Sequence, residues 1–196
     1  MAVKLMAIEI LFFSYLLGSI PNGLIFGKLI WKKDLRKIGS GNIGATNAWR
    51  NLGKKAGLLI FALDFLKGSL SVLLAENFIG EPVLMILAGL FAILGHSFSL
   101  FLKFHGGKGV ATGLGVIAML MPKITAIVFL IWLAIVFVTR YVSLGSIVAS
   151  VCVPLLAIFF SEPTEFILLG AVAAVFITLR HKENISRLAN GTENKV

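Results

Sequence analysis

The stretch ITAIVFLIWLAIVFVT, residues 124–139, is apolar apart from two threonines and contains no charged residue. Its hydrophobic residues form a continuous run, whereas the strands of a membrane barrel alternate apolar and polar residues. A helix hydrogen-bonds its own backbone groups, so a continuous apolar run is stable as a helix within lipid. The stretch therefore predicts a membrane-spanning α-helix.

The composition extends this interpretation to most of the chain. Of the 196 residues, 58% are hydrophobic and only 14% are charged. A soluble domain of this length has too much surface for its volume to hide so many apolar side chains. The bilayer must therefore be the solvent for most of the chain. We expect an all-α integral membrane protein with one domain over residues 1–196.

Seven apolar runs are expected to form seven transmembrane helices. The fourth run would span only about 18 Å as a helix, against a hydrocarbon core of about 30 Å. Within the first run, Ser19, Pro21 and Asn22 are expected to kink the helix and to turn polar groups toward the bundle. We place the helices at residues 5–30, 56–77, 82–102, 110–121, 124–139, 143–160 and 165–180.

The loop charges predict the orientation of the chain. Lys and Arg concentrate after the first, third, fifth and seventh runs. The opposite connections carry Glu76 and Glu81, then Glu162 and Glu165, with Lys123 as the exception. The positive-inside rule then places the N-terminus outside and the C-terminus in the cytoplasm. This pattern fails unless the fourth run crosses the membrane, so we count it as a crossing. The net charge of +9 fits topology and anionic ligands rather than nucleic acid.

A first polar segment, RKIGSGNIGATNAWR, occupies residues 36–50. Glycines let backbone N–H groups turn toward a phosphate, and Arg50 can grip a phosphate with two hydrogen bonds. The glycine spacing imitates a dinucleotide fingerprint, but no strand precedes it, so we reject that interpretation. A plain cytoplasmic turn with topology-setting cations is the alternative. Trp49 suggests a piece lying at the membrane interface. The candidate ligands besides Arg50 are Ser40, Gly41, Asn42, Gly44, Thr46 and Asn47.

A second polar segment, HGGKG at residues 105–109, opens directly into the fourth apolar run. The free N–H groups and the dipole of a helix N-terminus favour a bound phosphate, and Lys108 supplies a positive charge. The alternative is a flexible loop with one anchoring lysine. Gly106, Gly107 and Gly109 complete this candidate site. For His96, just upstream, structural hydrogen bonding and substrate contact are equally open.

A third polar segment lies at the end of the seventh run. His181 and Asn184 are three residues apart and share a face if the helix continues. His181 is a candidate general base or phosphate ligand, and Ser146 either binds substrate or packs. Asp64 and Lys67 lie one turn apart within the second run, which favours an ion pair that holds the bundle over a transport relay. In the predicted topology all three polar segments face the cytoplasm, which indicates a single site for phosphate groups.

Residues 36–50, 95–112 and 181–187 resemble the three cytoplasmic motifs of the bacterial acyl-phosphate:glycerol-3-phosphate acyltransferases. The resemblance implies transfer of a fatty acyl group from acyl phosphate to the sn-1 hydroxyl of glycerol-3-phosphate. The implied products are lysophosphatidic acid and inorganic phosphate, in the first step of bacterial phospholipid biosynthesis. The implied catalytic residues are Lys108, Arg50, His181 and Asn184, in a site that faces the cytoplasm from the bacterial inner membrane. His105 stands where many relatives are expected to carry lysine.

Other chemistries fit the sequence less well. Acyltransferases that use thioester donors often carry a His-x4-Asp pair, but Phe101 stands five positions after His96. The cytoplasmic carboxylates Asp34, Glu183 and Glu193 are too few to suggest a metal site. We expect no cofactor or metal, a monomer, and membrane lipids as the only partners besides the two substrates.

Two further classes of protein stay as alternatives. A transporter of phosphorylated solutes commonly has repeated halves and groups reachable from both faces, and neither is visible in the sequence. A structural, lipid-organising membrane protein would leave the glycine-rich segments unexplained.

Overall fold

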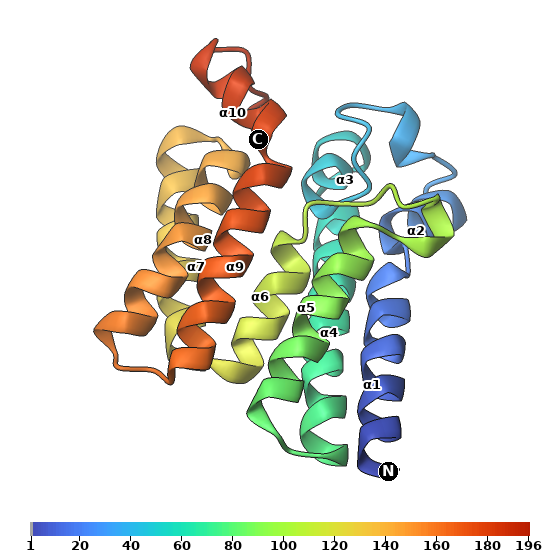
Figure 1. Cartoon of the computed structure of the whole chain (residues 1–196). Coiled ribbons are helices and arrows are strands. Elements are labelled where there is room, and N and C mark those ends of the chain that lie inside the picture. Colours follow the sequence, from blue (N-terminus) through green and yellow to red (C-terminus); the bar gives the residue numbers. More distant parts are fainter. Residues whose placement is uncertain (1) are drawn as a thin grey trace. The chain divides into compact units, whose positions relative to one another are not determined.

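The computed structural model describes residues 2–196, which form helices joined by turns and contain no strand. The expected all-α class is thereby confirmed. The chain divides into two compact units, Met1–Met119 and Leu120–Val196, which we call unit 1 and unit 2 and describe separately (Figure 1). The single domain over residues 1–196 stays a prediction.

Unit 1 is built around three long helices, α1, α4 and α5, which pack against one another. The short helices α2 and α3 pack on α4 and on each other. In Figure 1 the loops that carry the polar segments lie where α1 gives way to α2, away from the N-terminus. The elements are α1 (Ala2–Ser19), α2 (Asn22–Leu29), the 3-10 helix η1 (Leu35–Lys37), α3 (Ala45–Leu52), α4 (Lys54–Phe78), α5 (Pro82–Ser97), the 3-10 helix η2 (Leu100–Leu102) and α6 (Val110–Leu120), whose last residue belongs to unit 2.

Two of the expected continuous helices are broken. The run at 5–30 divides at Ile20 and Pro21, so the expected kink is a full break between α1 and α2. Proline has no N–H to donate and disfavours helical geometry in the residue before it. The run at 82–102 likewise ends as a helix at Ser97, and η2 follows. The Ser99 hydroxyl there donates a 2.5 Å hydrogen bond to the Ser19 carbonyl, which joins the two breaks.

Glycines allow the helix backbones of unit 1 to touch. A Cβ atom at Gly68 of α4 would overlap the carbonyl oxygen of Thr112 in α6, and one at Gly115 of α6 would overlap the Phe65 carbonyl. A Cβ atom at Gly18 of α1 would overlap Ala92 of α5 in the same way. Small residues of this kind let helices in lipid approach closely enough for extensive van der Waals contact. Glycine contacts therefore hold α6 against α4.

The expected ion pair inside unit 1 is confirmed. Lys67 Nζ lies 3.0 Å from Asp64 Oδ1, and both side chains are almost fully buried. Lys67 also donates to the carbonyl oxygen of Ile20 at 3.1 Å, and Asn22 Nδ2 donates to Asp64 Oδ1 at 3.0 Å. The pair therefore ties α4 to the break between α1 and α2.

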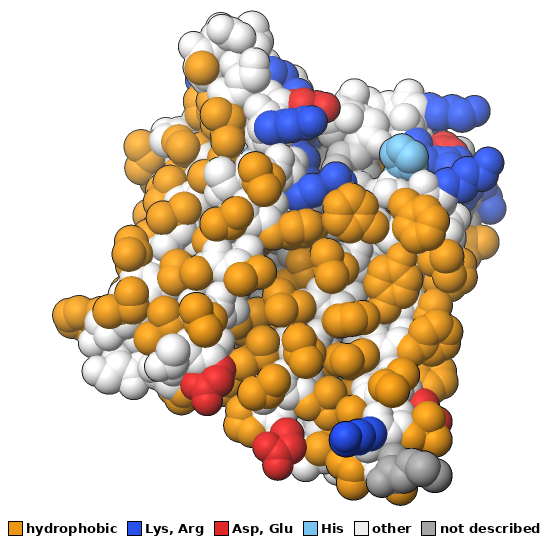
Figure 2. Space-filling view, viewed as in Figure 1, with side chains coloured by type: hydrophobic (Ala, Val, Ile, Leu, Met, Phe, Trp, Pro, Cys, Tyr) orange, Lys and Arg blue, Asp and Glu red, His pale blue; other side chains and the backbone are white. Residues whose placement is uncertain are grey.

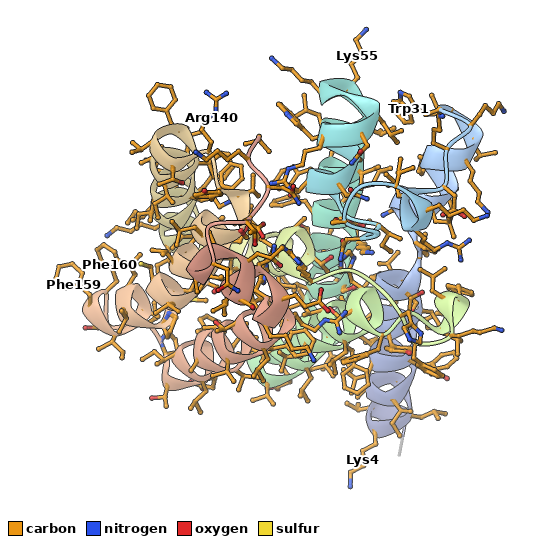
Figure 3. All side chains as sticks on the ribbon, turned by 90° about the horizontal axis from the view of Figure 1, so that it is seen from above. Lys4, Trp31, Lys55, Arg140, Phe159 and Phe160 are labelled. Carbon is orange, nitrogen blue, oxygen red and sulfur yellow. The ribbon has the colours of Figure 1, made fainter. Side chains whose placement is uncertain are left out.

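Unit 2 contains α7 (Pro122–Thr139), α8 (Val142–Phe159), α9 (Thr164–Arg180) and α10 (Lys182–Ala189). Helix α8 packs against both α7 and α9. The axes of α9 and α10 differ by 61° across the junction at His181. Phe159 and Phe160 lie at the far end of α8 (Figure 3), and Phe159 is 76% exposed, as expected for a side chain that faces lipid.

The C-terminal residues 191–196 fold back onto the connection between α7 and α8. The backbone N–H of Val196 donates to the carbonyl oxygen of Arg140 at 3.0 Å, and Arg140 Nε donates to the Val196 carbonyl at 2.8 Å. Arg140 directly follows α7 (Figure 3). Lys195 lies over the ring of Tyr141, 5.3 Å from its centroid. These contacts hold the tail beside the start of α8.

Glu193 carries the central polar contacts of the tail and is buried. Its Oε1 accepts hydrogen bonds from Ser143 Oγ at 3.0 Å and Asn184 Nδ2 at 2.7 Å, and its Oε2 accepts one from Arg187 Nε at 2.8 Å. Burial alone would raise the pKa of Glu193, but these three hydrogen bonds outweigh it and hold the pKa below that of an ordinary glutamate. The carboxylate is therefore charged at neutral pH and joins the tail to α8 and α10.

Several of the described helices are candidates for crossing a membrane. Five segments are long and apolar enough to cross a membrane, and the bent pair α9 and α10 raises the number to as many as six. Helix α6, with 11 residues, is apolar but shorter. In Figure 2 hydrophobic side chains cover much of the visible face of unit 1, whereas Lys and Arg gather mainly at the end that carries α2. Seven crossings and the orientation of the termini stay predictions. The five segments are Ala2–Ser19, Lys54–Phe78, Pro82–Leu102, Pro122–Thr139 and Val142–Phe159.

We expect Gly68→Ala to destabilise the protein. Alanine is the better helix former by about 1 kcal/mol, but the new methyl group would overlap the backbone of Thr112, and overpacking costs about 1–3 kcal/mol. The melting temperature in detergent should fall by about 2–10 °C. The control is Leu70→Ala on the same helix, where the side chain is 43% exposed, which should change the melting temperature by less than half as much. An unchanged melting temperature for Gly68→Ala would show that α6 is not held in this way.

We expect Glu193→Gln to lower the melting temperature by several degrees at pH 7, because a hydrogen bond to a charged group contributes about 1.5–3 kcal/mol. The folded-state pKa lies below the unfolded value. The contribution is therefore fully present above the unfolded pKa of about 4.3, and it is lost as the pH falls through the folded pKa.

The difference in melting temperature between the wild type and Glu193→Gln should accordingly narrow below about pH 4. The matched control is Glu183→Gln, whose side chain is 78% exposed and lies 4.0 Å from Arg187. This variant should melt within about 1 °C of the wild type, because an exposed ion pair contributes little. A difference for Glu193→Gln that stays constant from pH 7 to pH 3 would contradict the assignment.

Candidate active site

The first polar segment is organised around the side chain of Asn47, which is 3% exposed. Its Nδ2 donates to three backbone carbonyls, those of Leu35 at 3.1 Å, Ile38 at 3.1 Å and Asn42 at 2.8 Å. Its Oδ1 accepts a hydrogen bond from the backbone N–H of Ser40 at 3.1 Å. Asn47 therefore shapes the loop from inside, a positioning role that sequence reasoning did not separate from direct substrate binding.

The loop itself presents backbone to solvent. Gly39 and Gly41 have φ angles of +57° and +71°, a region that glycine adopts without strain. Ser40 and Gly41 are exposed, and their backbone N–H groups donate to Asn47 Oδ1 and to the Ile38 carbonyl, both at 3.1 Å. Asn42 Oδ1 accepts a hydrogen bond from the N–H of Gly44 at 2.8 Å, and Gly44 is the residue that precedes α3. The loop therefore ends at a helix N-terminus.

Helix α3 is short and amphipathic, which fits the expected interfacial piece. It carries Thr46 in its first turn and Arg50 in its last, both half-buried. Nearby, Asp34 accepts two hydrogen bonds from the Arg36 guanidinium, at 3.0 and 2.6 Å. The hydrogen bond from Arg36 holds the pKa of Asp34 well below its usual range. Arg36 is therefore paired with this carboxylate.

The second polar segment lies directly against His96. The N–H of Gly107 donates to the His96 carbonyl at 3.0 Å. A Cβ atom at Gly106 would overlap that same carbonyl, and one at Gly107 would overlap the imidazole ring. Lys108 is half-buried and Gly109, with φ of +83°, leads into α6. Lys108 and Gly109 therefore stand at the N-terminal end of a helix, as predicted.

The first and second segments are anchored to the same part of unit 1. A Cβ atom at Gly23, in the first turn of α2, would overlap the carbonyl of Ile43 in the first loop. Ser19, at the end of α1, receives the hydrogen bond from Ser99, just upstream of the second segment. The break between α1 and α2 therefore positions both candidate phosphate-binding segments.

In unit 2, His181 lies at the junction between α9 and α10, and its residue is 4% exposed. Its Nδ1 lies 2.8 Å from the Ile177 carbonyl oxygen. A carbonyl only accepts, so Nδ1 carries the proton in the neutral ring and Nε2 holds the lone pair. In this tautomer the basic atom of the ring is Nε2.

Asn184 and Ser146 are also buried in unit 2. Asn184 lies in α10, beyond the 61° bend, so it does not continue the straight helix face that the spacing suggested. Its Nδ2 donates to Glu193 Oε1 at 2.7 Å, which orients the amide group. Ser146 Oγ donates to the Val142 carbonyl at 2.9 Å. Sequence reasoning missed the role of Glu193 because nothing in the local pattern connects it with Asn184 or Ser143.

The candidate residues thus form two groups. Arg50 and Lys108 belong to unit 1, and His181 and Asn184 belong to unit 2. Their union in one site stays a prediction, as do their individual roles. Within residues 2–196, no three side chains of His, Cys, Asp or Glu are grouped so that they could hold a metal ion.

Known proteins resemble this chain over nearly its whole length. A family model for glycerol-3-phosphate acyltransferase matches residues 8–191. The chain is 47% identical over 183 residues to a glycerol-3-phosphate acyltransferase of Carboxydothermus hydrogenoformans, covering 93% of each protein. It is 48% identical over 183 residues to glycerol-3-phosphate acyltransferase 2 of Moorella thermoacetica, covering 93% of this chain and 94% of that protein.

Solved structures also resemble this chain. The crystal structure of PlsY, an integral membrane glycerol 3-phosphate acyltransferase, in its glycerol 3-phosphate form matches with a TM-score of 0.92 and 43% identity, covering 97% of this chain and 95% of that one. The lysophosphatidic acid form of that protein matches with a TM-score of 0.90 and 43% identity, covering 96% and 94%. The resemblance carried by the three polar segments is therefore confirmed, and the chain belongs to the glycerol-3-phosphate acyltransferase family.

Proposed function

We propose that the protein transfers a fatty acyl group from acyl phosphate to the sn-1 hydroxyl of glycerol-3-phosphate. The observation that carries this proposal is the turn Gly106–Gly107–Lys108, which places a half-buried lysine directly before α6, at the positive end of a helix dipole. A second phosphate-binding loop in the same unit suits a reaction whose two substrates both carry phosphate. The glycerol 3-phosphate form of the similar crystal structure supports the choice of acceptor.

The reaction needs alignment and charge neutralisation more than a strong nucleophile. Acyl phosphate is a mixed anhydride, so its carbonyl carbon is already activated. The acceptor hydroxyl oxygen attacks that carbon, the bond from the carbon to the phosphate oxygen breaks, and inorganic phosphate leaves with the electron pair. The hydroxyl proton passes to a phosphate oxygen of a substrate or to His181 Nε2. Lys108 stabilises the negative charge that develops on the leaving phosphate.

The candidate residues divide by substrate. Arg50, Ser146, His181 and Asn184 hold glycerol-3-phosphate, with Lys108 near both phosphates. The exposed residues Ser40 and Gly41 bind the acyl phosphate together with the second turn. Asn42, Asn47 and Gly44 maintain the shape of the first loop through the hydrogen bonds described above. The remaining candidate residues around the two phosphates are Thr46, His96, Gly106, Gly107 and Gly109.

The proposed setting is the bacterial inner membrane, with seven crossings, the N-terminus outside and the site facing the cytoplasm. This orientation puts the Lys-rich and Arg-rich end of unit 1 on the cytoplasmic side, in line with the positive-inside rule. The acyl chain of the donor then enters sideways from lipid, while glycerol-3-phosphate arrives from water. We propose that the protein acts as a monomer without metal or cofactor.

The first test is a two-product assay. Purified protein in detergent, incubated with palmitoyl phosphate and glycerol-3-phosphate, should release one orthophosphate for each lysophosphatidic acid formed. The reaction should proceed without ATP, acyl-CoA or added metal, because the donor carries its own activation. The control omits glycerol-3-phosphate and should release no phosphate above the protein-free rate. Absence of both products from monodisperse protein would overturn the proposal, and liposome uptake of phosphorylated solutes would then test the transporter alternative.

The second test concerns Lys108. Lys108→Ala should lower kcat about 10²-fold or more, because removing a group that stabilises transition-state charge typically has an effect of this size. The matched control is Lys37→Ala, which removes an exposed lysine from the first polar segment of the same unit and should change kcat less than threefold. A loss under threefold for Lys108→Ala would remove Lys108 from the site.

A further inference from the structure

A buried polar cluster lies beneath the second polar segment of unit 1. Its centre is Asp64 Oδ1, which Asn22 Nδ2 and Lys67 Nζ each approach to 3.0 Å. The Nδ1 atom of His96 faces the same oxygen at 3.7 Å. The side chains of Lys67, His96 and Asp64 are 4%, 5% and 3% exposed, so the cluster is closed to solvent. Three helices, α2, α4 and α5, therefore converge on one carboxylate oxygen.

The opposite side of His96 supports the glycine turn. The three atoms nearest to a Cβ placed on Gly107 are Nε2, Cε1 and Cδ2 of the His96 ring, and Nε2 would overlap it. The backbone N–H of Gly107 donates to the His96 carbonyl at 3.0 Å. The turn therefore packs against this histidine and contacts both its ring and its backbone. Lys108 is the next residue along the chain.

The ring is held in place from two directions. Asp64 faces its Nδ1 edge. The neighbouring Gly95 is pressed so closely on α1 that a Cβ there would overlap the carbonyl of Tyr15. Because the ring lies directly against Gly107, a shift of the ring would displace the turn. On the other side of Lys108, the contact between Gly68 and Thr112 fixes the start of α6 on α4.

A role in stability alone accounts poorly for the cluster. Burying an ion pair and two further polar groups within membrane-spanning helices is expensive, and apolar side chains of similar volume often stabilise a protein as well or better. The cluster lies directly against the turn, and positioning the turn would explain why the free-energy cost of burying these polar groups is tolerated. A displacement of about 1 Å at a reacting group can lower a rate about 10²-fold.

We propose that Asp64 and His96 are positioning residues: Asp64 orients the His96 ring, and the ring sets the height and direction of the Gly106–Gly107–Lys108 turn. Neither side chain touches substrate. This role rests on the proposed function of Lys108, and it replaces direct substrate contact for His96. Asn22 and Lys67 in turn hold the Asp64 carboxylate in place.

A double-mutant cycle tests the contact between the ring and the turn. Gly107→Ala alone should lower kcat/KM for acyl phosphate about 10²-fold, because its methyl group displaces the turn. His96→Ala alone should lower it at least tenfold. The double variant should be no worse than His96→Ala, because all three ring atoms near the new methyl group are gone. Losses that multiply in the double variant would overturn the proposal.

A second variant tests the part played by Asp64. Asp64→Asn with Lys67→Met removes both buried charges together, so no unpaired charge is left behind. It should lower kcat/KM at least tenfold, although both residues lie away from the substrates. His96→Asn keeps an amide that can reach Asp64 but lacks the ring edge that faces Gly107, and it serves as the variant if His96→Ala does not fold. It should show the same loss.

Kinetics are measured on monodisperse protein well below each variant's melting temperature, which separates positioning from simple loss of structure. The matched control is Leu94→Ala on α5, where the side chain is 37% exposed, and it should keep kcat/KM within threefold. Full activity in folded His96→Asn or in the charge-free variant would reduce the cluster to a structural role and overturn the proposal. If the unaltered protein itself shows no turnover, the acyltransferase function fails first, and the positioning role fails with it.

Discussion

The backbone carbonyls released at Ser19 and Ile20 impose the constraint on which unit 1 depends. A helix that breaks within a membrane leaves carbonyl groups that water cannot reach, and each must find a donor inside the protein. Lys67 donates to the Ile20 carbonyl and Ser99 donates to the Ser19 carbonyl. One donor comes from α4 and the other from the loop after α5. Satisfying the break therefore brings α4 and the second polar segment to the same place.

Glycine contacts between α6 and α4 fix the position of the second polar segment. Helix α6 has 11 residues and would rise only about 16 Å, so it cannot bury much area by length alone. Backbone contacts at Gly68 and Gly115 compensate by bringing α6 and α4 together without intervening side chains. The start of α6, where Lys108 and Gly109 stand, is therefore held by close packing on one side and by His96 on the other. A phosphate-binding turn needs this rigidity, because its effect on a rate depends on placement.

In unit 2, a buried charged group holds the C-terminal tail in place. Its tail carries no apolar run, yet it folds back because Glu193 accepts hydrogen bonds from α8 and α10. The arginine partner keeps the carboxylate ionised despite its burial. The same carboxylate occupies one amide hydrogen of Asn184 and so orients the side chain that the proposed reaction uses. His181 is oriented by a simpler device, a hydrogen bond to its own helix backbone.

The sequence by itself determined the class of the protein and predicted the location of its chemistry. The continuous apolar runs dictated helices in lipid, because only a helix satisfies its backbone there. The polar segments at 36–50 and 105–109 could be recognised because they combine glycine, hydroxyl and cationic residues between long apolar runs. Pro21 predicted a kink in the first helix. The spacing of Asp64 and Lys67, one helical turn apart, predicted their ion pair.

Only the tertiary structure decided what these residues touch. Asn47 turned inward to hold three carbonyls, His96 came to lie against Gly107, and Glu193 in the tail folded back to Asn184 in α10. Local periodicity cannot reveal such contacts, because they involve loop and tail residues that follow no helical pattern, or a turn that packs against a distant helix. The sequence thus indicated the candidate groups for phosphate binding, and the tertiary contacts decided which of them hold the others in place.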